Sequence, residues 1–452
     1  MLSAVGFILV IVMVALIIQG KVALPPILIL LPTIATIVLG LAGALAIGDA
    51  APAAMGILDC LKTLKGYLDS GLKSVLNTAC LFTFAVVFFN VLGDAGMFDT
   101  IVAKVMKYIG NNIGLILLMT CLLATISHLD GSGATTMLIT IPTMLPLFKK
   151  MKVSPVLLLL YVGLTSGVVN MLPWTSALAR VSAATGVDAH AIWSALLPVQ
   201  ILGLAIIYVS CFVVGPMLKK KGLGMSDAEF AELKSGMLKP ADSVLQVSKG
   251  VLIFDMLLTL ALVLCMLFGW VNTNVAFMVG LAIALLVNCK GSKEMTAQIK
   301  KHGSNALNMV MIIFSIGMLV GVMQQSGMMS AMTQTLVDLL PESMGSHLTF
   351  IISLVSVPLS MLVGSDTVYM VMTPIFGEMA VVYGGTTMAA CCATVVGSCI
   401  AANLSLVGPT PYLALGLAGV EMGENLKKNF IPTWALGIVL AIVGAVVGAY
   451  PF

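Results

Sequence analysis

Asp130-Gly-Ser-Gly-Ala-Thr-Thr136 and Gly364-Ser-Asp-Thr367 are polar, glycine-bearing breaks within two otherwise apolar segments, residues 112–148 and 346–383. Each break leaves two apolar halves of about 16 residues, which is marginal for crossing a bilayer. Irregular backbone at membrane depth is tolerated only where it is buried in protein or lines a water-filled cavity. We therefore expect both segments to form re-entrant hairpins with the polar break at the tip.

The rest of the chain has the composition of a membrane protein. Of its 452 residues, 60% are hydrophobic and 9% are charged, whereas a soluble domain has about 25% charged residues. The recurring apolar runs are near the length of a spanning helix, and none alternates as β-barrel strands do. The predicted fold is an all-α polytopic membrane protein with about ten transmembrane helices plus the two re-entrant hairpins. The predicted crossings are residues 2–20, 23–47, 74–93, 153–186, 190–216, 248–270, 271–289, 306–325, 384–420 and 430–450.

The two halves of the chain repeat at a nearly constant offset. Gly131 and Gly364 are 233 residues apart, as are Asn170 and Asn403. Each half holds five predicted crossings, and an odd number inverts the second half in the membrane. We expect a first inverted repeat over residues 1–216 (hairpin 112–148, broken helix 153–186), a cytoplasmic loop over 217–247, and a second repeat over 248–452 (hairpin 346–383, broken helix 384–420).

Lysines predict the orientation, because cytoplasmic loops carry the excess of basic residues. The longest polar loop holds five of them: Lys219, Lys220, Lys221, Lys234 and Lys239. Placing this loop in the cytoplasm also puts Lys104, Lys107 and most other lysines there. Lys62, Lys65 and Lys73 remain outside, on an expected amphipathic surface segment. Both termini are then outside a bacterial cytoplasmic membrane.

The chemistry of the tips suits ion and carboxylate binding. Free helix N-termini attract anions and free carbonyls attract cations. Glycines permit the required backbone angles, and hydroxyls serve as donors or acceptors. The candidate binding residues at the tips are Gly131, Ser132, Gly133, Thr135, Thr136, Gly364, Ser365 and Thr367. Asp130 and Asp366 are acids at membrane depth and predict coupling-ion sites, although Asp before Gly-Ser is also good helix-capping chemistry. His128 could relay a proton or only cap.

A broken helix follows each hairpin. Asn170-Met-Leu-Pro-Trp-Thr-Ser176 interrupts one crossing and Asn403-Leu-Ser-Leu-Val-Gly-Pro-Thr-Pro411 interrupts the other. Proline removes a backbone donor and disfavours helix at the residue before it. Asn, Pro and hydroxyl residues at both breaks predict unwound binding segments. The candidates are Asn170 and Asn403 for the coupling ion, and Pro173, Trp174, Thr175, Pro409 and Thr410 for substrate.

Arg180 is the only arginine of the chain and lies in an apolar crossing. Its planar fork suits a carboxylate, but it could instead snorkel to the outer interface. Asp255 and Glu378 are further acids in apolar runs, and Asp255 has no motif around it that assigns a role. No G-x-x-x-x-G-K-[ST] loop is present, which argues against ATP-driven transport by this chain alone.

At these motifs the sequence resembles the citrate–metal–proton symporter (CitMHS) family of the ion transporter superfamily. The resemblance lies in Leu-Asp-Gly-Ser-Gly-Ala-Thr-Thr-Met-Leu-Ile-Thr (129–140), Asn170-Met-Leu-Pro-Trp174, Ala179-Arg180 and Leu415-Gly-Leu-Ala-Gly-Val-Glu421, and it runs over nearly the whole chain. It implies a scaffold domain, a moving transport domain, a homodimer and elevator-type alternating access. It also implies proton-driven uptake of citrate complexed to a divalent cation.

Matching positions carry the family's pattern, with two departures. Those that match are Asp130, Gly131, Gly133, Thr136, Asn170, Pro173, Trp174, Arg180, Asp366 and Tyr369. The family tip usually reads Asp-Gly-Asp-Gly, whereas this chain has Ser132 at the second acid. After Pro-Trp the family usually has Gly-Gly, whereas here stand Thr175 and Ser176. One acid fewer weakens the case for a metal-bearing substrate.

The predicted function is a symporter that imports citrate or a related di- or tricarboxylate, with Mg²⁺ or Ca²⁺ carried on the substrate and no metal bound directly by the protein. Protons or sodium would drive it. A cation/proton antiporter without organic substrate is the alternative. No cofactor and no nucleic-acid partner are expected. An enzyme would need a nucleophile–base or metal-ligand set, and of the four histidines only His128 is expected at membrane depth.

Overall fold

The chain folds as an assembly of helices. The computed structural model describes residues 1–19, 21–45, 54–98, 100, 112–226, 230, 245, 247–268, 270–339, 342–406 and 409–452. Within this part of the chain there is no β-strand, and eight helices are long and apolar enough to cross a membrane. Four shorter apolar helices accompany them. The predicted all-α polytopic class is therefore confirmed.

The first half runs from three helices into a hairpin, a broken helix and a last long helix. Its elements are α1 (Leu2–Gln19), α2 (Leu24–Leu41), α3 (Ile57–Asp94), α5 (Ile113–Ser127), the 3₁₀ turn η1 (His128–Asp130), α6 (Gly133–Lys150), α7 (Pro155–Val169), α8 (Ser176–Thr185) and α9 (Ala189–Lys220). Both predicted interruptions are present: η1 separates α5 from α6, and residues 170–175 separate α7 from α8.

The second half has a similar order, with five described helices before its hairpin against three in the first half. Its elements are α11 (Lys249–Leu267), α12 (Thr273–Asn288), α13 (Ser292–Gln325), α14 (Met328–Leu339), α15 (Glu342–Gly345), α16 (Leu348–Val363), α17 (Ser365–Thr367), the π-helical turn η2 (Val368–Met372), α18 (Thr373–Val382), α19 (Thr387–Ala401), the 3₁₀ turn η3 (Ala402–Leu404), α20 (Pro409–Ala418) and α21 (Met422–Val446). The hairpin α16–α18 thus corresponds to α5–α6, and the broken helix α19–α20 corresponds to α7–α8.

Two helices are longer than their apolar cores suggest. We expected crossings from residues 74 and 306, but α3 begins at Ile57 and α13 at Ser292. The expected amphipathic segment around Lys62 is therefore the first part of α3, where Lys62 lies exposed and pairs with Asp59. Hydropathy marks where a helix meets lipid, whereas polar residues continue the same helix beyond it.

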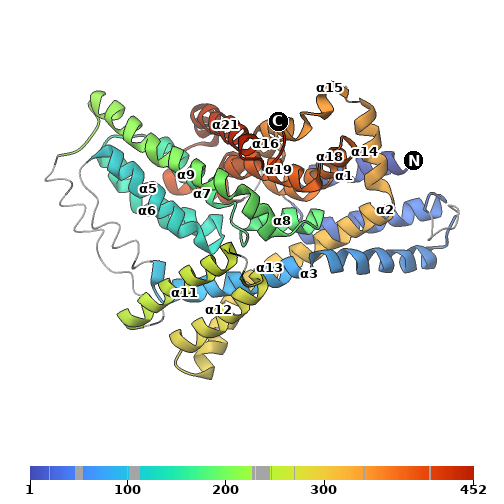
Figure 1. Ribbon diagram of the computed structural model, residues 1–452, viewed down its shortest axis with the longest axis horizontal. Coiled ribbons are helices and arrows are strands. Elements are labelled where there is room, and N and C mark those ends of the chain that lie inside the picture. Colours follow the sequence, from blue (N-terminus) through green and yellow to red (C-terminus); the bar gives the residue numbers. More distant parts are fainter. Residues whose placement is uncertain are drawn as a thin grey trace.

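Glycines allow α3 and α13 to lie against each other, as Figure 1 shows along the lower part of the molecule. A Cβ placed on Gly71 of α3 would lie 1.9 Å from the carbonyl oxygen of Gly317, and one on Gly321 would lie 2.1 Å from that of Tyr67. Small residues at such crossings are typical of helix packing in membranes. Helices α11 and α12 lie on the same side, whereas the hairpins and broken helices form the body above.

Part of the predicted connecting loop lies outside the described residues. This concerns 227–229, 231–244 and 246 of the loop 217–247, including Lys234 and Lys239, as well as Lys104 and Lys107. Of Pro409 only the backbone is described. The boundaries of the two repeats, 1–216 and 248–452, stay a prediction.

Candidate functional site

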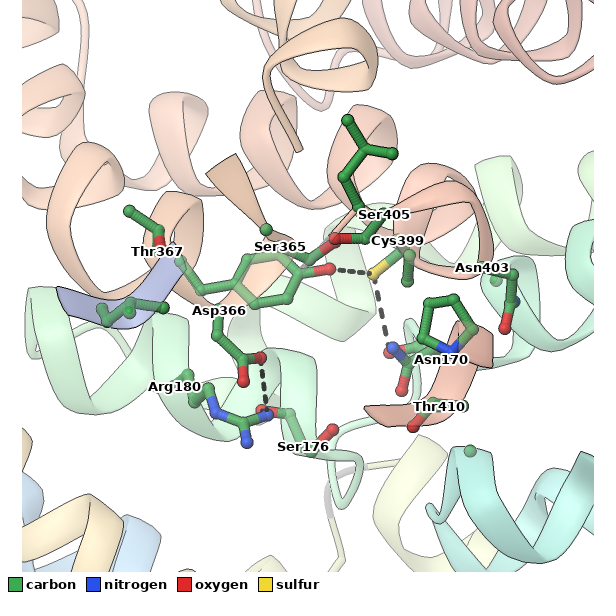
Figure 2. A pocket seen from close by; sticks show the side chains of 18 of the residues that line it. Asn170, Ser176, Arg180, Ser365, Asp366, Thr367, Cys399, Asn403, Ser405 and Thr410 are labelled. Atoms are coloured by element: carbon green, nitrogen blue, oxygen red, sulfur yellow. Dashed lines mark hydrogen bonds and ion pairs between the residues drawn. The ribbon is translucent and has the colours of Figure 1, made fainter. Parts of the chain in front are cut away.

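A cavity of about 630 Å³ opens where the second hairpin tip meets both broken helices. Tip residues Gly364 to Thr367 form one side, and the ends of the broken helices form the other (Figure 2). The start of α2 adds an apolar wall. The lining residues are Ile17, Val22, Ala23, Leu24, His128, Gly133, Ser166, Gly167, Asn170, Ser176, Arg180, Gly364, Ser365, Asp366, Thr367, Tyr369, Cys399, Ala402, Asn403, Ser405, Leu406, Thr410, Pro411 and Tyr412.

An ion pair crosses this cavity. Nη1 of Arg180, on α8, lies 3.3 Å from Oδ1 of Asp366 at the second tip, and it also donates to the carbonyl of Ser176 at 3.3 Å. Figure 2 shows the two side chains pointing toward each other from different elements. The Asp366 side chain is 41% exposed, but that of Arg180 is only 11% exposed, and its Nε has no hydrogen-bond partner. A buried donor without a partner costs free energy, so the guanidinium retains one unused hydrogen-bond donor beside the ion pair.

Two asparagines frame the far side of the cavity. Asn403 donates through Nδ2 to Oγ of Ser166 at 3.0 Å and to the carbonyl of Gly163 at 3.1 Å. Asn170 ends α7, and its carbonyl accepts from the hydroxyl of Thr175 at 2.6 Å and lies 3.8 Å from the Cys399 thiol. Asn403, at the second break, therefore contacts α7 of the first broken helix. Asn170, at the first break, contacts its own unwound turn and Cys399 of α19.

The first tip is occupied with its own hydrogen bonds. Oδ1 of Asp130 accepts the backbone N–H of Ser132 at 2.8 Å, and Oγ of Ser132 accepts the N–H of Thr135 at 3.3 Å to cap α6. His128 is buried between Thr136, 2.7 Å from its Nδ1, and Asn170, 3.3 Å from its Nε2. Gly131 has a φ of +76° and closes the turn. The Asp130 carboxylate therefore stabilises the turn just before α6, whereas Ser132 is the residue that caps this helix.

Trp174 points away from the cavity into an aromatic cluster. It stacks on Phe89 of α3 with ring centroids 5.5 Å apart and meets Phe277 of α12 edge-on at 5.4 Å. Its indole N–H donates to the carbonyl of Leu129 at 2.8 Å. This side chain therefore holds the first tip against α3 and α12, a role that the spacing of the sequence motif did not indicate.

The structure brings together only part of the predicted set. Nine predicted residues line the cavity, namely Gly133, Asn170, Arg180, Gly364, Ser365, Asp366, Thr367, Asn403 and Thr410. Eight do not: Asp130, Gly131, Ser132, Thr135, Thr136, Pro173, Trp174 and Thr175. For these eight, direct contact with a ligand stays a prediction that their placement does not favour. The side chain of Pro409 lies outside the described residues, so its predicted role stays a prediction. At the first tip the acid and the hydroxyls hydrogen-bond within the turn itself, which a tip sequence favours as readily as contact with a ligand.

Several polar lining residues were not among the predicted binding residues. Ser166, Ser176, Cys399, Ser405 and Tyr412 face the cavity, and Tyr369 donates to the Cys399 thiol at 3.3 Å. Ser166 lies four residues before Asn170, and Cys399 four residues before Asn403, so each shares a helix face with its asparagine. That spacing was the available signal. Within the described residues no group of three His, Cys, Asp or Glu side chains could hold a metal ion.

Comparisons with known proteins agree with this architecture. Residues 7–301 and 263–451 match the model of the citrate transporter family. A citrate transporter of Bacillus subtilis is 30% identical over 462 residues, covering 100% of both chains. A Mg(2+)/citrate complex secondary transporter of the same organism is 30% identical over 455 residues, covering 99% of both. MtrF of Neisseria gonorrhoeae, described as an antimetabolite efflux pump, shares the fold alone, with a TM-score of 0.61 at 12% identity over 94% of this chain and 95% of its own. Because the family model spans nearly the whole sequence, the chain belongs to the citrate transporter family.

Proposed function

We propose that this protein imports citrate or a related di- or tricarboxylate by secondary active transport, with the substrate complexed to a divalent cation and uptake driven by protons or sodium. The observation that carries the proposal is the Arg180–Asp366 pair across a cavity of about 630 Å³, in a member of the citrate transporter family. The volume lies within the range of small-molecule sites. One relative is a Mg(2+)/citrate complex secondary transporter, which supports the metal-bearing substrate.

Arg180 binds a substrate carboxylate in this proposal. The guanidinium already has an unpartnered Nε, and its fork can take two carboxylate oxygens at once. A carboxylate at Arg180 competes with Asp366 for the same cation. The displaced Asp366 then needs positive charge, which a divalent cation on the substrate, a sodium ion or a proton can supply. The ion pair thus links substrate binding to the uptake of positive charge.

The remaining lining residues complete the site. Ser365, Thr367 and Thr410 offer hydroxyls to the carboxylate oxygens. Thr367 is fully buried and its hydroxyl has no hydrogen-bond partner, so it is free to turn toward a ligand. Asn170 and Asn403 face the opposite end of the cavity and offer amide oxygens to a coupling cation.

An elevator-type mechanism in a homodimer is part of the proposal, as the resemblance to the citrate–metal–proton symporter family implies. The glycine contacts between α3 and α13 suit a rigid scaffold, while the two hairpins and broken helices carry the site. Trp174, Phe89 and Phe277 are then contacts between the moving and fixed parts. We place the lysine-rich 217–247 loop in the cytoplasm and both termini outside.

Uptake of labelled citrate into proteoliposomes tests the proposal. It is measured with and without Mg²⁺, under an imposed proton or sodium gradient. We expect gradient-driven uptake that Mg²⁺ increases. No gradient-driven uptake of any di- or tricarboxylate would refute the proposal, and sodium-driven proton flux without an organic anion would support a cation/proton antiporter. Cysteine accessibility at introduced positions near each terminus reports the orientation independently.

A further inference from the structure

Asp255 is a fully buried acid in a helix that otherwise faces outward. It lies on α11, where Ile253, Leu257 and Leu260 are 59%, 58% and 54% exposed. Asp255 itself is 0% exposed and is turned toward α12. It does not line the described cavity, none of whose lining residues belongs to α11 or α12. An ionisable group at this depth is costly unless its charge is compensated or removed.

One hydrogen bond joins Asp255 to α12 and leaves two oxygens without a donor. Nδ2 of Asn288 donates to Oδ1 of Asp255 at 2.9 Å and to the carbonyl of Ala284 at 3.0 Å. The carbonyl of Ala284 can only accept, which establishes that Nδ2, and not Oδ1, points to it. Oδ2 of Asp255 and Oδ1 of Asn288 are both buried and have no partner. Asp255 and Asn288 are therefore joined by one hydrogen bond, and each of the two side chains also carries one unpaired acceptor oxygen.

Neither an ion pair nor a bound metal ion explains this arrangement. No salt bridge of Asp255 occurs among the described residues, where the charged groups nearest in sequence are Lys249 and Lys290 at the helix ends. The hydroxyl of Thr259 donates to the backbone carbonyl of Asp255 at 2.8 Å, so it does not donate to the Asp255 carboxylate. A hard cation would take about six oxygen ligands, whereas only two side-chain oxygens here are free.

A single proton satisfies both oxygens at once. A protonated carboxyl has one O–H donor beside its carbonyl acceptor, and a primary amide has the complementary acceptor and donor. We propose that Asp255 holds a proton, which it donates from Oδ2 to Oδ1 of Asn288, so that an acid–amide pair with two hydrogen bonds fastens α11 to α12. This proton belongs to the contact between α11 and α12 and not to the cavity lining.

Infrared spectroscopy of the purified full-length protein in proteoliposomes tests the proton directly. The carbonyl stretch of a protonated carboxylic acid is separate from that of a carboxylate and shifts in heavy water. We expect wild type to show a protonated-acid band that Asp255→Asn lacks, and that Asp130→Asn, as a matched control at another buried acid, leaves in place. If the wild-type and Asp255→Asn spectra coincide in this region, Asp255 is ionised and the proposal is wrong.

Thermal unfolding tests the pairing itself. In Asp255→Asn the new amide N–H replaces the acid O–H as donor to Asn288, so both hydrogen bonds persist and Tm stays at the wild-type value. Asn288→Ala and Asp255→Ala leave one buried polar group alone and lower Tm. A loss of Tm in Asp255→Asn as large as in Asp255→Ala would show that a negative charge is required there and would overturn the proposal.

Discussion

The two hairpin tips repeat in sequence but differ in their surroundings. The first tip directs its acid and hydroxyls inward: Asp130 accepts from Ser132, Ser132 caps α6, and His128 lies between Thr136 and Asn170. The second tip directs Asp366 into the cavity, where it meets Arg180. A sequence repeat therefore predicts where two turns form, whereas the neighbours of each turn determine whether its polar groups are available to a ligand.

Arg180→Gln is expected to have the largest effect, because the change removes the cation that faces the second tip. Loss of a charged hydrogen-bonding partner costs about 2–3 kcal/mol, which corresponds to about a 30- to 150-fold loss of apparent affinity. Citrate uptake into proteoliposomes at varied citrate concentration measures it. Arg180→Lys keeps the charge but not the planar fork and serves as the control. Unchanged affinity in Arg180→Lys would instead favour an arginine that snorkels to the interface.

The pair Asp366→Asn and Asp130→Asn compares the tips directly. Asp366→Asn removes the acid that takes up positive charge once citrate displaces it from Arg180, so we expect citrate uptake to fall about tenfold and its dependence on Mg²⁺ or on the driving ion to weaken. Asp130→Asn retains an oxygen that accepts the Ser132 N–H, so uptake should change by less than about threefold. Uptake at varied Mg²⁺ and driving-ion concentration measures both variants. If Asp130→Asn abolishes uptake while Tm is retained, the first tip carries the coupling ion after all.

The order of the elements could be predicted from the sequence because each rests on local chemistry. Apolar length predicts crossings, glycine with polar residues predicts the tips, and Asn with Pro predicts the breaks that begin at Asn170 and Asn403. The helix ends were less predictable, since α3 continues through residues as polar as Lys62. Hydropathy indicates which part of a helix contacts lipid, but it does not indicate how far the helix extends beyond the membrane.

The membership of the site depends on contacts between distant residues, which spacing alone does not reveal. Arg180 and Asp366 are 186 residues apart in the sequence, yet their charged groups meet across the cavity. Trp174 stands in the middle of a predicted binding motif but faces Phe89 and Phe277. The first broken helix has one side toward the cavity and another toward α3 and α12, and the sequence does not indicate which residue faces which side.

Substitutions of Ser132 are expected to have the smallest effects, and they test the difference between the two tips most selectively. Ser132→Ala removes the α6 cap and should lower the free energy of unfolding by about 1 kcal/mol, while apparent citrate affinity changes less than about twofold because Ser132 does not line the cavity. Ser132→Asp keeps the cap, since aspartate is also a good N-cap residue, and should retain Tm. Thermal unfolding and uptake measure both variants, with Ser365→Ala as the matched change at the second tip. There we expect the reverse, a loss of affinity with little loss of Tm, because Ser365 lines the cavity and makes only a 3.3 Å bond to the Ser398 carbonyl.

A rise in affinity for Mg²⁺-citrate in Ser132→Asp would show that the first tip reaches the substrate's metal ion, and the difference between the tips would then be one of distance within a single site.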